Sequence, residues 1–268
     1  MAESSKNKKI GLALGSGAVR GYALFPIINR IKKEGIDIAA VSGSSIGALI
    51  GAYYALHGET DSLLKQAAKL KKKDWLKLVD PNKPNISLIK GEKIKKFLTN
   101  HYYEDATFKD TQIPLIVCAT DPIKRKSVFL DEGKIIDAVM ASISIPGIFP
   151  PYKINNRLFI DGGILDPVPV KPLRDMGIKK IVGINLMGYI EPNPDKDMDL
   201  IFSLLNTSYM MMEQISKREE NKNLFILEPK FMPDPPNMLS FHKWKDKHKI
   251  GQELIDTKIT ELAAWLKK

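Results

Sequence analysis

A serine between closely spaced glycines is the feature of this sequence with the clearest potential for chemistry. The pentapeptide Gly43-Ser44-Ser45-Ile46-Gly47 follows an apolar run, residues 38–41, and precedes a helix-like segment, residues 48–56. A G-x-S-x-G pattern between a strand and a helix is typical of a nucleophile elbow, a sharp turn that exposes the central serine. Glycine on both sides removes Cβ atoms that would collide where strand and helix nearly touch. The pattern therefore predicts Ser45 as a nucleophile, although such a turn also occurs where it serves packing alone.

The group that would accept a proton from Ser45 is not a histidine in any tight motif. The four histidines lie in segments that predict surface positions: His57, His101, His242 and His248. Asp161 is the better candidate for a general base, because it ends a strand-like segment and precedes Gly162-Gly163, which let the backbone approach a partner closely. A carboxylate can take this role when a partly apolar setting raises its pKa. An Asp-Gly-Gly turn is also common as a purely structural feature.

A glycine-rich loop near the start of the sequence, residues 15–21, offers backbone N–H groups between a strand candidate and a helix candidate. Such groups attract a pyrophosphate, and Gly15-x-Gly17 matches the beginning of a dinucleotide-binding fingerprint. The match is incomplete, because Arg20 stands where the fingerprint needs a small residue and no acidic residue ends the second strand candidate. The same donors could instead stabilise the oxyanion of a tetrahedral intermediate. A tight turn without a ligand is the third interpretation.

Composition and length indicate an ordinary globular protein. The chain has 268 residues, with 44% hydrophobic and 27% charged residues, and no stretch approaches the ~20 apolar residues that cross a bilayer. The polar segment Met1–Lys9 lacks the apolar core of a secretory signal, and the single cysteine, Cys118, cannot form an internal disulfide. We therefore expect one cytoplasmic α/β domain. No metal is expected, since no set of His, Cys or carboxylate residues has ligand spacing.

An excess of positive charge raises the question of an anionic partner. The net charge is +10, and the densest basic cluster, Lys65–Lys77, contains Trp75. This cluster fits a solvated helix face, or a peripheral contact with an anionic membrane surface in which Trp75 lies at the interface. Nucleic acid is disfavoured, because no reading module and no aromatic residues on a strand face are evident. No motif in the sequence specifies the oligomeric state.

The predicted elements alternate between strands and helices, which indicates a mostly parallel sheet with covering helices. The predicted strands are Lys9–Leu14, Ile38–Val41, Ile113–Thr120, Ser127–Leu130, Arg157–Ile160, Lys179–Leu186 and Leu224–Leu227. The first predicted helix ends near Glu34. The others span Ala48–Leu56, Asp61–Leu78, Gly91–Tyr102, Ile135–Ser142, Asp199–Glu219 and Ile250–Leu266. We interpret residues 60–109 as a basic helical cap over a core of about residues 9–190. Residues 195–268 then form a C-terminal helical region of the same domain.

Three motifs in this order resemble the patatin-like phospholipase family, and most closely its short bacterial members. They are the glycine-rich loop with Arg20, the G-x-S-x-G turn, and Asp161-Gly162-Gly163. The similarity extends through three segments within about residues 9–190: Leu12–Leu24, Ala141–Pro151 and Leu158–Val170. The resemblance implies a three-layer α/β/α fold with a mostly parallel central sheet and with the serine on a nucleophile elbow.

The resemblance also implies hydrolysis of a lipid ester without a cofactor. Ser45 would attack the ester carbonyl, Asp161 would accept its proton as the sole partner in a Ser-Asp dyad, and water would release the fatty acid. The oxyanion site would comprise residues that carry exposed backbone donors or positive potential: Gly15, Gly17, Ala18, Arg20 and Ile46. Ala18 stands where the family often has glycine, which matters if φ must be positive there.

Two other function classes stay open at this point. One is a non-catalytic module that binds a membrane or a partner through its basic face. The other is a dinucleotide-binding oxidoreductase, suggested by Gly15-x-Gly17. Ser142 and Ser144 also lie near glycine and proline, but they lack flanking glycines and are interpreted as loop-packing residues.

Overall fold

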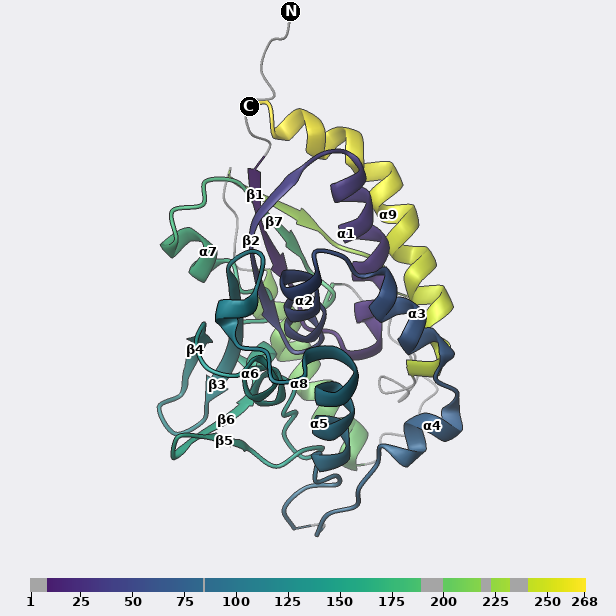
Figure 1. The fold of residues 1–268 in the computed structure, drawn as a ribbon, viewed down its shortest axis with the longest axis vertical. Coiled ribbons are helices and arrows are strands. Elements are labelled where there is room, and N and C mark those ends of the chain that lie inside the picture. Colours follow the sequence, from purple (N-terminus) through teal and green to yellow (C-terminus); the bar gives the residue numbers. More distant parts are fainter. Residues whose placement is uncertain (1–8, 84, 189–199, 218–222, 232–240) are drawn as a thin grey trace, which may run out of the picture.

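Eight strands form one mixed sheet in the computed structural model, which describes residues 9–83, 85–188, 200–217, 223–231 and 241–268 (Figure 1). The strands are β1 (Lys9–Leu14), β2 (Asp37–Ser44), β3 (Leu115–Asp121), β4 (Lys126–Leu130), β5 (Tyr152–Ile154), β6 (Arg157–Asp161), β7 (Ile181–Ile184) and β8 (Leu224–Leu227). Their order is β5-β6-β3-β2-β1-β7-β8, with β4 also paired to β3. The strands from β3 to β8 in this order run parallel, whereas β4, β5 and β6 pair antiparallel. The predicted mostly parallel sheet is confirmed.

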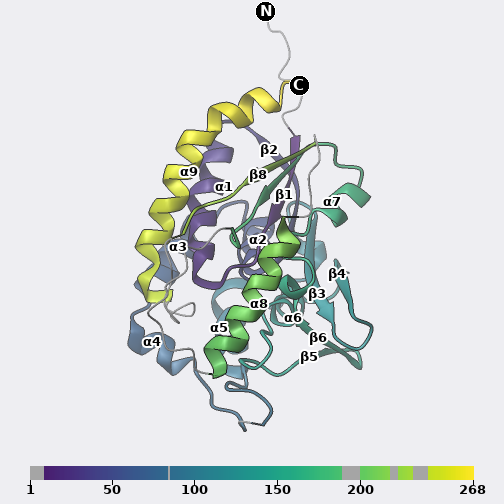
Figure 2. The ribbon, with the colours of Figure 1, turned by 180° about the vertical axis from the view of Figure 1, so that it is seen from behind.

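Helices cover both faces of this sheet. They are α1 (Leu24–Lys33), α2 (Ile46–His57), α3 (Asp61–Lys69), α4 (Lys72–Lys77), α5 (Glu92–Leu98), α6 (Ile135–Ser142), α7 (Lys171–Asp175), α8 (Leu200–Ser216) and α9 (Trp244–Trp265). Figure 1 shows α2 in front of the sheet, and Figure 2, turned by 180°, shows α8 in front of it. The predicted three-layer α/β/α architecture is therefore confirmed.

The apolar pattern of β1 explains why both faces are covered. Leu12 and Leu14 are fully buried in the large core cluster with α1 and α2, whereas Ala13 packs on the opposite face with Leu173 and Ile181. Successive side chains of a strand point to opposite faces, so a strand that is apolar throughout must be covered on both faces.

Among the described residues, every helix is too short or too polar to cross a bilayer.

The segment interpreted as a cap, residues 60–109, differs from its predicted helices. The single charged helix expected over Asp61–Leu78 is two helices, α3 and α4. Leu70 and Lys71 adopt extended backbone with ψ of 117° and 165°, and the Asp74 carboxylate accepts the N–H of Lys71 at 3.1 Å. An acidic residue at this position of a first turn starts a new helix. The helix predicted over Gly91–Tyr102 is α5, followed by a π-helical turn at Thr99–Tyr103.

Two short elements were missed by sequence reasoning. The strand β5 pairs with β6 through a tight turn at Asn155-Asn156, where φ is 46° and 62°. Asparagine tolerates this left-handed backbone, so the dipeptide was a usable signal for a hairpin. The helix α7 has a proline in its first turn, which suits a helix start but is easily taken for a loop.

The terminal helix α9 begins at Trp244, six residues earlier than the predicted start at Ile250. The predicted helix over Asp199–Glu219 is α8, although residues 199, 218 and 219 lie outside the described residues.

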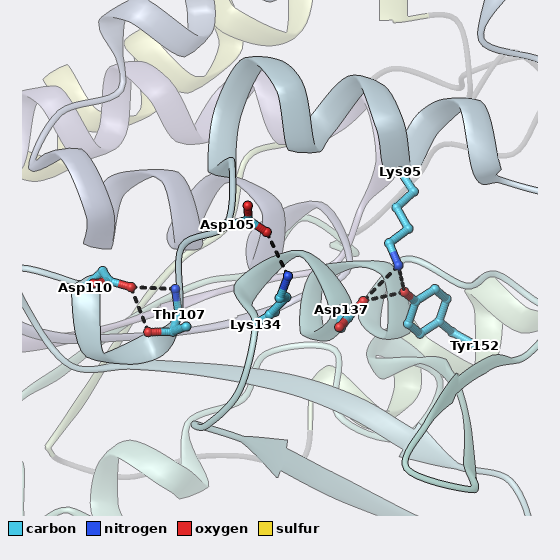
Figure 3. Close-up of polar contacts among 7 residues, drawn as sticks. All are labelled: Lys95, Asp105, Thr107, Asp110, Lys134, Asp137 and Tyr152. Carbon is cyan, nitrogen blue, oxygen red and sulfur yellow. Dashed lines mark hydrogen bonds and ion pairs between the residues drawn. The ribbon is translucent and has the colours of Figure 1, made fainter.

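Polar contacts fasten the cap to the core beneath it (Figure 3). Lys95 of α5 reaches Asp137 of α6 at 3.0 Å and Tyr152 of β5 at 2.6 Å, while the Tyr152 hydroxyl donates to Asp137 at 2.6 Å. Burial is the main cause that raises the pKa of Tyr152 to about 12, so it stays a neutral donor. Lys134 and Asp105 pair at 2.7 Å in the same region. These contacts hold α5 over α6.

Candidate active site

The register of β3 places Ser45 beside Asp161. Ser44, at the end of β2, pairs with Cys118, and Asp161, at the end of β6, pairs with the next residue, Ala119. Residues 117–121 of β3 also pair with β4, which occupies one edge of the strand. The β6 strand must therefore continue the opposite edge, directly where β2 stops. Ser45, which follows β2, and Asp161, 116 residues later in the chain, are thus brought to neighbouring positions along β3.

The turn that carries Ser45 is strained and closely packed. Ser45 has φ of 54° and ψ of −122°, a conformation that non-glycine residues rarely adopt. A Cβ atom at Gly43 would lie 2.4 Å from the carbonyl oxygen of Gly47, and one at Gly47 would lie 2.2 Å from that of Leu14. The expected collisions are therefore real. Only glycine at both positions lets α2 start this close to β1 and β2.

The glycines after Asp161 have an equally specific reason. A Cβ atom at Gly162 would lie 2.1 Å from the Cys118 carbonyl oxygen, and one at Gly163 would lie 2.1 Å from the Oγ of Ser16. The chain therefore passes in contact with β3 and with the glycine-rich loop immediately after the carboxylate. Larger residues at these two positions would displace Asp161 from the elbow.

Ser45 and Asp161 are joined by a short hydrogen bond. Ser45 Oγ donates to Asp161 Oδ2 at 2.6 Å, and the N–H of Gly163 donates to Asp161 Oδ1 at 2.8 Å. Both side chains are buried, with Asp161 only 3% exposed. Burial raises the pKa of Asp161 from 3.8 to about 7, although the hydrogen bonds from Ser45 and Gly163 act in the opposite direction. A carboxylate with this pKa can accept a proton near neutral pH.

Ser142 supports the elbow, a role that sequence reasoning missed. Its fully buried Oγ accepts the N–H of Ser45 at 2.8 Å and donates to the Cys118 carbonyl at 2.6 Å. The main chain of Ser144 contributes as well, since its carbonyl accepts the N–H of Asp161 at 2.9 Å. The interpretation of both serines as loop-packing residues is therefore incomplete. No feature of the residue types announces these contacts, which depend on α6 reaching the ends of β2 and β6.

The glycine-rich loop supplies fewer free donors than expected. The N–H of Gly15 donates to Ile184 at 3.0 Å, and that of Ser16 donates to Pro167 at 2.9 Å. The prediction that Gly15 donates to an oxyanion is therefore wrong, because its N–H already forms a hydrogen bond within the fold. These internal bonds also weigh against a pyrophosphate site in the loop.

Three predicted donors have backbone N–H groups that the described fold does not use. Within the part of the chain that the structure describes, the N–H groups of Gly17, Ala18 and Ile46 donate no hydrogen bond. Ala18 has a positive φ of 47°, so the strain foreseen at this alanine is present. Ile46 begins α2, whose first N–H groups have no partner inside the helix. Ala18 and Ile46 line the same cavity as Ser45.

Arg20 braces the loop from inside the protein. It is 2% exposed, and its Nη1 donates to the carbonyl of Leu186 at 3.2 Å. Its guanidinium carbon lies 5.4 Å from the ring centre of Phe231 and 5.8 Å from that of Tyr209 in α8. These contacts tie the loop to Leu186, in the segment after β7.

None of the four histidines, all of which lie in described segments, hydrogen bonds to Ser45. His57 contacts the Tyr102 carbonyl at 3.2 Å, and His101 contacts that of Phe97 at 2.9 Å. His242 and His248 are half-buried, which differs from their predicted surface positions, and His242 lines the cavity. The described residues also hold no cluster of His, Cys, Asp or Glu side chains that could bind a metal ion.

A largely apolar cavity of about 440 Å³ opens beside Ser45. Its walls come from α2, α3, α4 and α5, with side chains such as Leu49, Leu63 and Leu98, and from the segment after α6, which contributes Phe149. Apolar walls favour a hydrocarbon chain over a polar ligand. The site therefore combines a serine hydrogen-bonded to a buried carboxylate, backbone N–H groups that donate no hydrogen bond among the described residues, and an apolar cavity.

Comparison with known proteins is consistent with this geometry. The family model for patatin-like phospholipases matches residues 12–174. An uncharacterized NTE family protein of Mycobacterium bovis is 34% identical over 195 residues, which are 73% of this chain and 53% of that protein. Lysophospholipase NTE1 of Cryptococcus neoformans var. neoformans is 29% identical over 79% of this chain and 14% of its own length. The chain thus spans about half the length of the first of these curated relatives and a smaller part of the second.

A solved structure with low sequence identity is similar to this chain in its fold only. VipD from Legionella pneumophila has a TM-score of 0.50 and 14% sequence identity, over 92% of this chain and 67% of that chain.

Proposed function

This chain belongs to the patatin-like phospholipase family, and on that premise we propose that it hydrolyses carboxyl esters of phospholipids or lysophospholipids through an acyl-enzyme. The observation that carries the proposal is the 2.6 Å hydrogen bond from Ser45 to Asp161, formed beside a cavity with apolar walls. A serine becomes a useful nucleophile when an adjacent base accepts its proton. The buried Asp161, with a pKa of about 7, meets that requirement.

The proposed reaction proceeds in two steps that use the same groups. Ser45 Oγ attacks the ester carbonyl carbon while Asp161 takes the hydroxyl proton, and the N–H groups of Gly17, Ala18 and Ile46 stabilise the oxyanion. The tetrahedral intermediate collapses when the C–O bond to the alcohol breaks, and Asp161 returns the proton to the departing oxygen. Water then attacks the acyl carbonyl carbon while Asp161 takes its proton. The bond from that carbon to Ser45 Oγ breaks, Asp161 returns the proton to Ser45, and the fatty acid is released.

In this proposal, the substrate is inferred from the cavity, and the location is inferred from the positive charge of the surface. The cavity would hold the acyl chain, and the basic cap would contact an anionic membrane surface peripherally. The proposal retains a cytoplasmic location at the inner membrane surface, which the sequence predicts. It needs neither nucleic acid nor cofactor.

Replacement of each dyad residue tests the proposal. Ser45→Ala and Asp161→Asn should each lower hydrolysis of a soluble p-nitrophenyl ester by about 10³-fold or more, with unchanged far-UV circular dichroism. Ser62→Ala, at an exposed serine of α3, is the matched control and should retain activity. Undiminished hydrolysis by Ser45→Ala would contradict the proposal. A fluorophosphonate probe that leaves Ser45 unlabelled would instead favour a non-catalytic binding module.

A further inference from the structure

The segment that comprises α4 and the chain leading to α5 presents apolar side chains to solvent. We call residues 71–83 and 85–90 the cap tip; the chain that follows α4 reaches the lower end of the molecule in Figure 1. Leu76 is 60% exposed and Ile86 is 54% exposed, and Val79 and Leu88 are exposed as well. Several large apolar side chains in one short segment exceed the scattered exposure that is normal for a protein surface.

Hydrogen bonds hold the cap tip in this shape. Pro81 and Ile89 form an antiparallel bridge, and the N–H of Asn82 donates to the Leu88 carbonyl at 3.1 Å. The N–H groups of Leu88 and Ile89 donate to Gly147 and Ile148 at 3.0 and 2.9 Å. The part of the cap tip that carries Ile86 and Leu88 is therefore paired with the loop after α6.

The charge displayed by the cap tip is positive. Its lysines are all exposed: Lys71, Lys72, Lys73, Lys77, Lys83 and Lys90. Its two acidic residues face other groups, since Asp74 accepts the N–H of Lys71 and the buried Asp80 accepts those of Gly91 and Lys93. Lysines around apolar side chains complement a surface of anionic head groups over hydrocarbon.

The cap tip also borders the cavity that contains Ser45. Lys72, Leu76 and Val79 line that cavity and are exposed to solvent at the same time. Trp75 does not take the interfacial position expected for it, because its indole Nε1 is buried and its ring stacks on Phe241 at 4.8 Å. The exposed aliphatic side chains, rather than Trp75, are therefore the groups available to enter a membrane.

We infer that the cap tip docks on an anionic lipid bilayer, with Leu76, Val79, Ile86 and Leu88 in the interface and the lysines on the head groups. Docking in this orientation places the opening of the cavity against the bilayer. An acyl chain can then reach Ser45 without being exposed to water, which would be unfavourable. The role in substrate entry rests on the proposed lipid hydrolysis, whereas the binding surface itself does not.

Vesicle co-sedimentation tests this inference on the full chain carrying Ser45→Ala, so that the lipid stays intact. Vesicles of equal parts phosphatidylcholine and phosphatidylglycerol should bind the protein, and vesicles of phosphatidylcholine alone should bind it much less. Lys73→Gln with Lys83→Gln, and separately Ile86→Ser, should each weaken binding by roughly tenfold. The matched controls are Lys33→Gln with Lys179→Gln, and Met176→Ser, at exposed residues that precede β2 and β7. These controls should bind as the parent does.

Equal losses in the tip and control lysine variants would show that net charge alone drives binding, and would overturn the inference. Full vesicle binding by Ile86→Ser would show that the cap tip does not enter the bilayer interface, and would also overturn the inference. With Ser45 present, the tip variants should retain hydrolysis of the soluble ester, since none of the replaced residues lines the cavity. Unchanged vesicle binding by the tip variants together with Ser45-dependent esterase activity would overturn docking alone. Esterase activity that is independent of Ser45 would overturn the proposed function alone.

Discussion

Ser45 Oγ lies 2.6 Å from Asp161 Oδ2, and the other oxygen of the same carboxylate accepts the N–H of Gly163 at 2.8 Å. Both donors are neutral, so burial has the larger influence and the pKa of Asp161 rises to about 7. The second oxygen holds the carboxylate in a fixed orientation while the first one faces the nucleophile. In the proposed reaction, this one aspartate takes the roles that a histidine and an orienting carboxylate share in a triad.

The pH dependence of hydrolysis should report this carboxylate. Asp161 accepts a proton only in its ionised form, so kcat/KM for a soluble ester should increase with pH and level off above about 7. Below that pH the protonated fraction grows, and the rate should fall about tenfold for each unit of pH. The measurement is a pH–rate profile under conditions where the protein stays folded. A profile that is flat from about pH 5 to 8 would contradict Asp161 as the base.

Asp161 should also lower the stability of the fold at neutral and alkaline pH. Its pKa in the folded protein, about 7, lies above the ordinary value of 3.8, so the folded state favours the protonated form. Its contribution to the free energy of unfolding is then most favourable below about pH 4 and is lost as pH rises through about 7. Asp161→Asn keeps the shape without the charge, and should raise the free energy of unfolding by on the order of 4 kcal/mol at about pH 8. Denaturant unfolding at about pH 8 and pH 4 checks this, because the gain should vanish at the lower pH.

Ser142 should affect turnover more than substrate binding. Ser142→Ala leaves the buried N–H of Ser45 and the carbonyl of Cys118 without their partner, a loss of about 1–3 kcal/mol. The elbow then holds Ser45 less firmly, so kcat should fall by about 10- to 100-fold with little change in KM. The control is Ser144→Ala, because that hydroxyl donates to Met140 within its own helical turn. A rise in KM without loss of kcat would show that Ser142 does not position the nucleophile.

The walls of the cavity should set the length of the acyl chain. Ala67 of α3 lines the cavity, whereas its neighbour Ala68 does not. Ala67→Phe should fill part of the space and lower kcat/KM for a long-chain ester by about tenfold relative to a short-chain ester. Ala68→Phe is the matched control and should leave the ratio of the two esters unchanged. Equal effects of both variants on both esters would indicate a general disturbance of α3 instead.

Local patterns allowed much of the fold to be predicted. The apolar runs of β1, β3 and β7 and the alternation of strands and helices indicated a mostly parallel sheet. These signals depend on side chains within a few residues of one another, so they can be read along the chain. The break between α3 and α4 was missed, because a lysine-rich segment continues through it and the cap by Asp74 appears only in the folded backbone.

The sequence by itself determined the residue types at the site and the two glycine-flanked turns that carry them. Glycine spacing around Ser45 and after Asp161 follows from close approach of the backbone, which excludes Cβ atoms wherever the fold makes such contacts. Only the tertiary structure decided which groups meet there. The pairing of Ser44 and Asp161 with adjacent residues of β3 brings the two turns together, and the use of the Gly15 N–H by Ile184 removes it from the donors. Contacts between distant segments depend on strand register and packing, which local patterns do not specify.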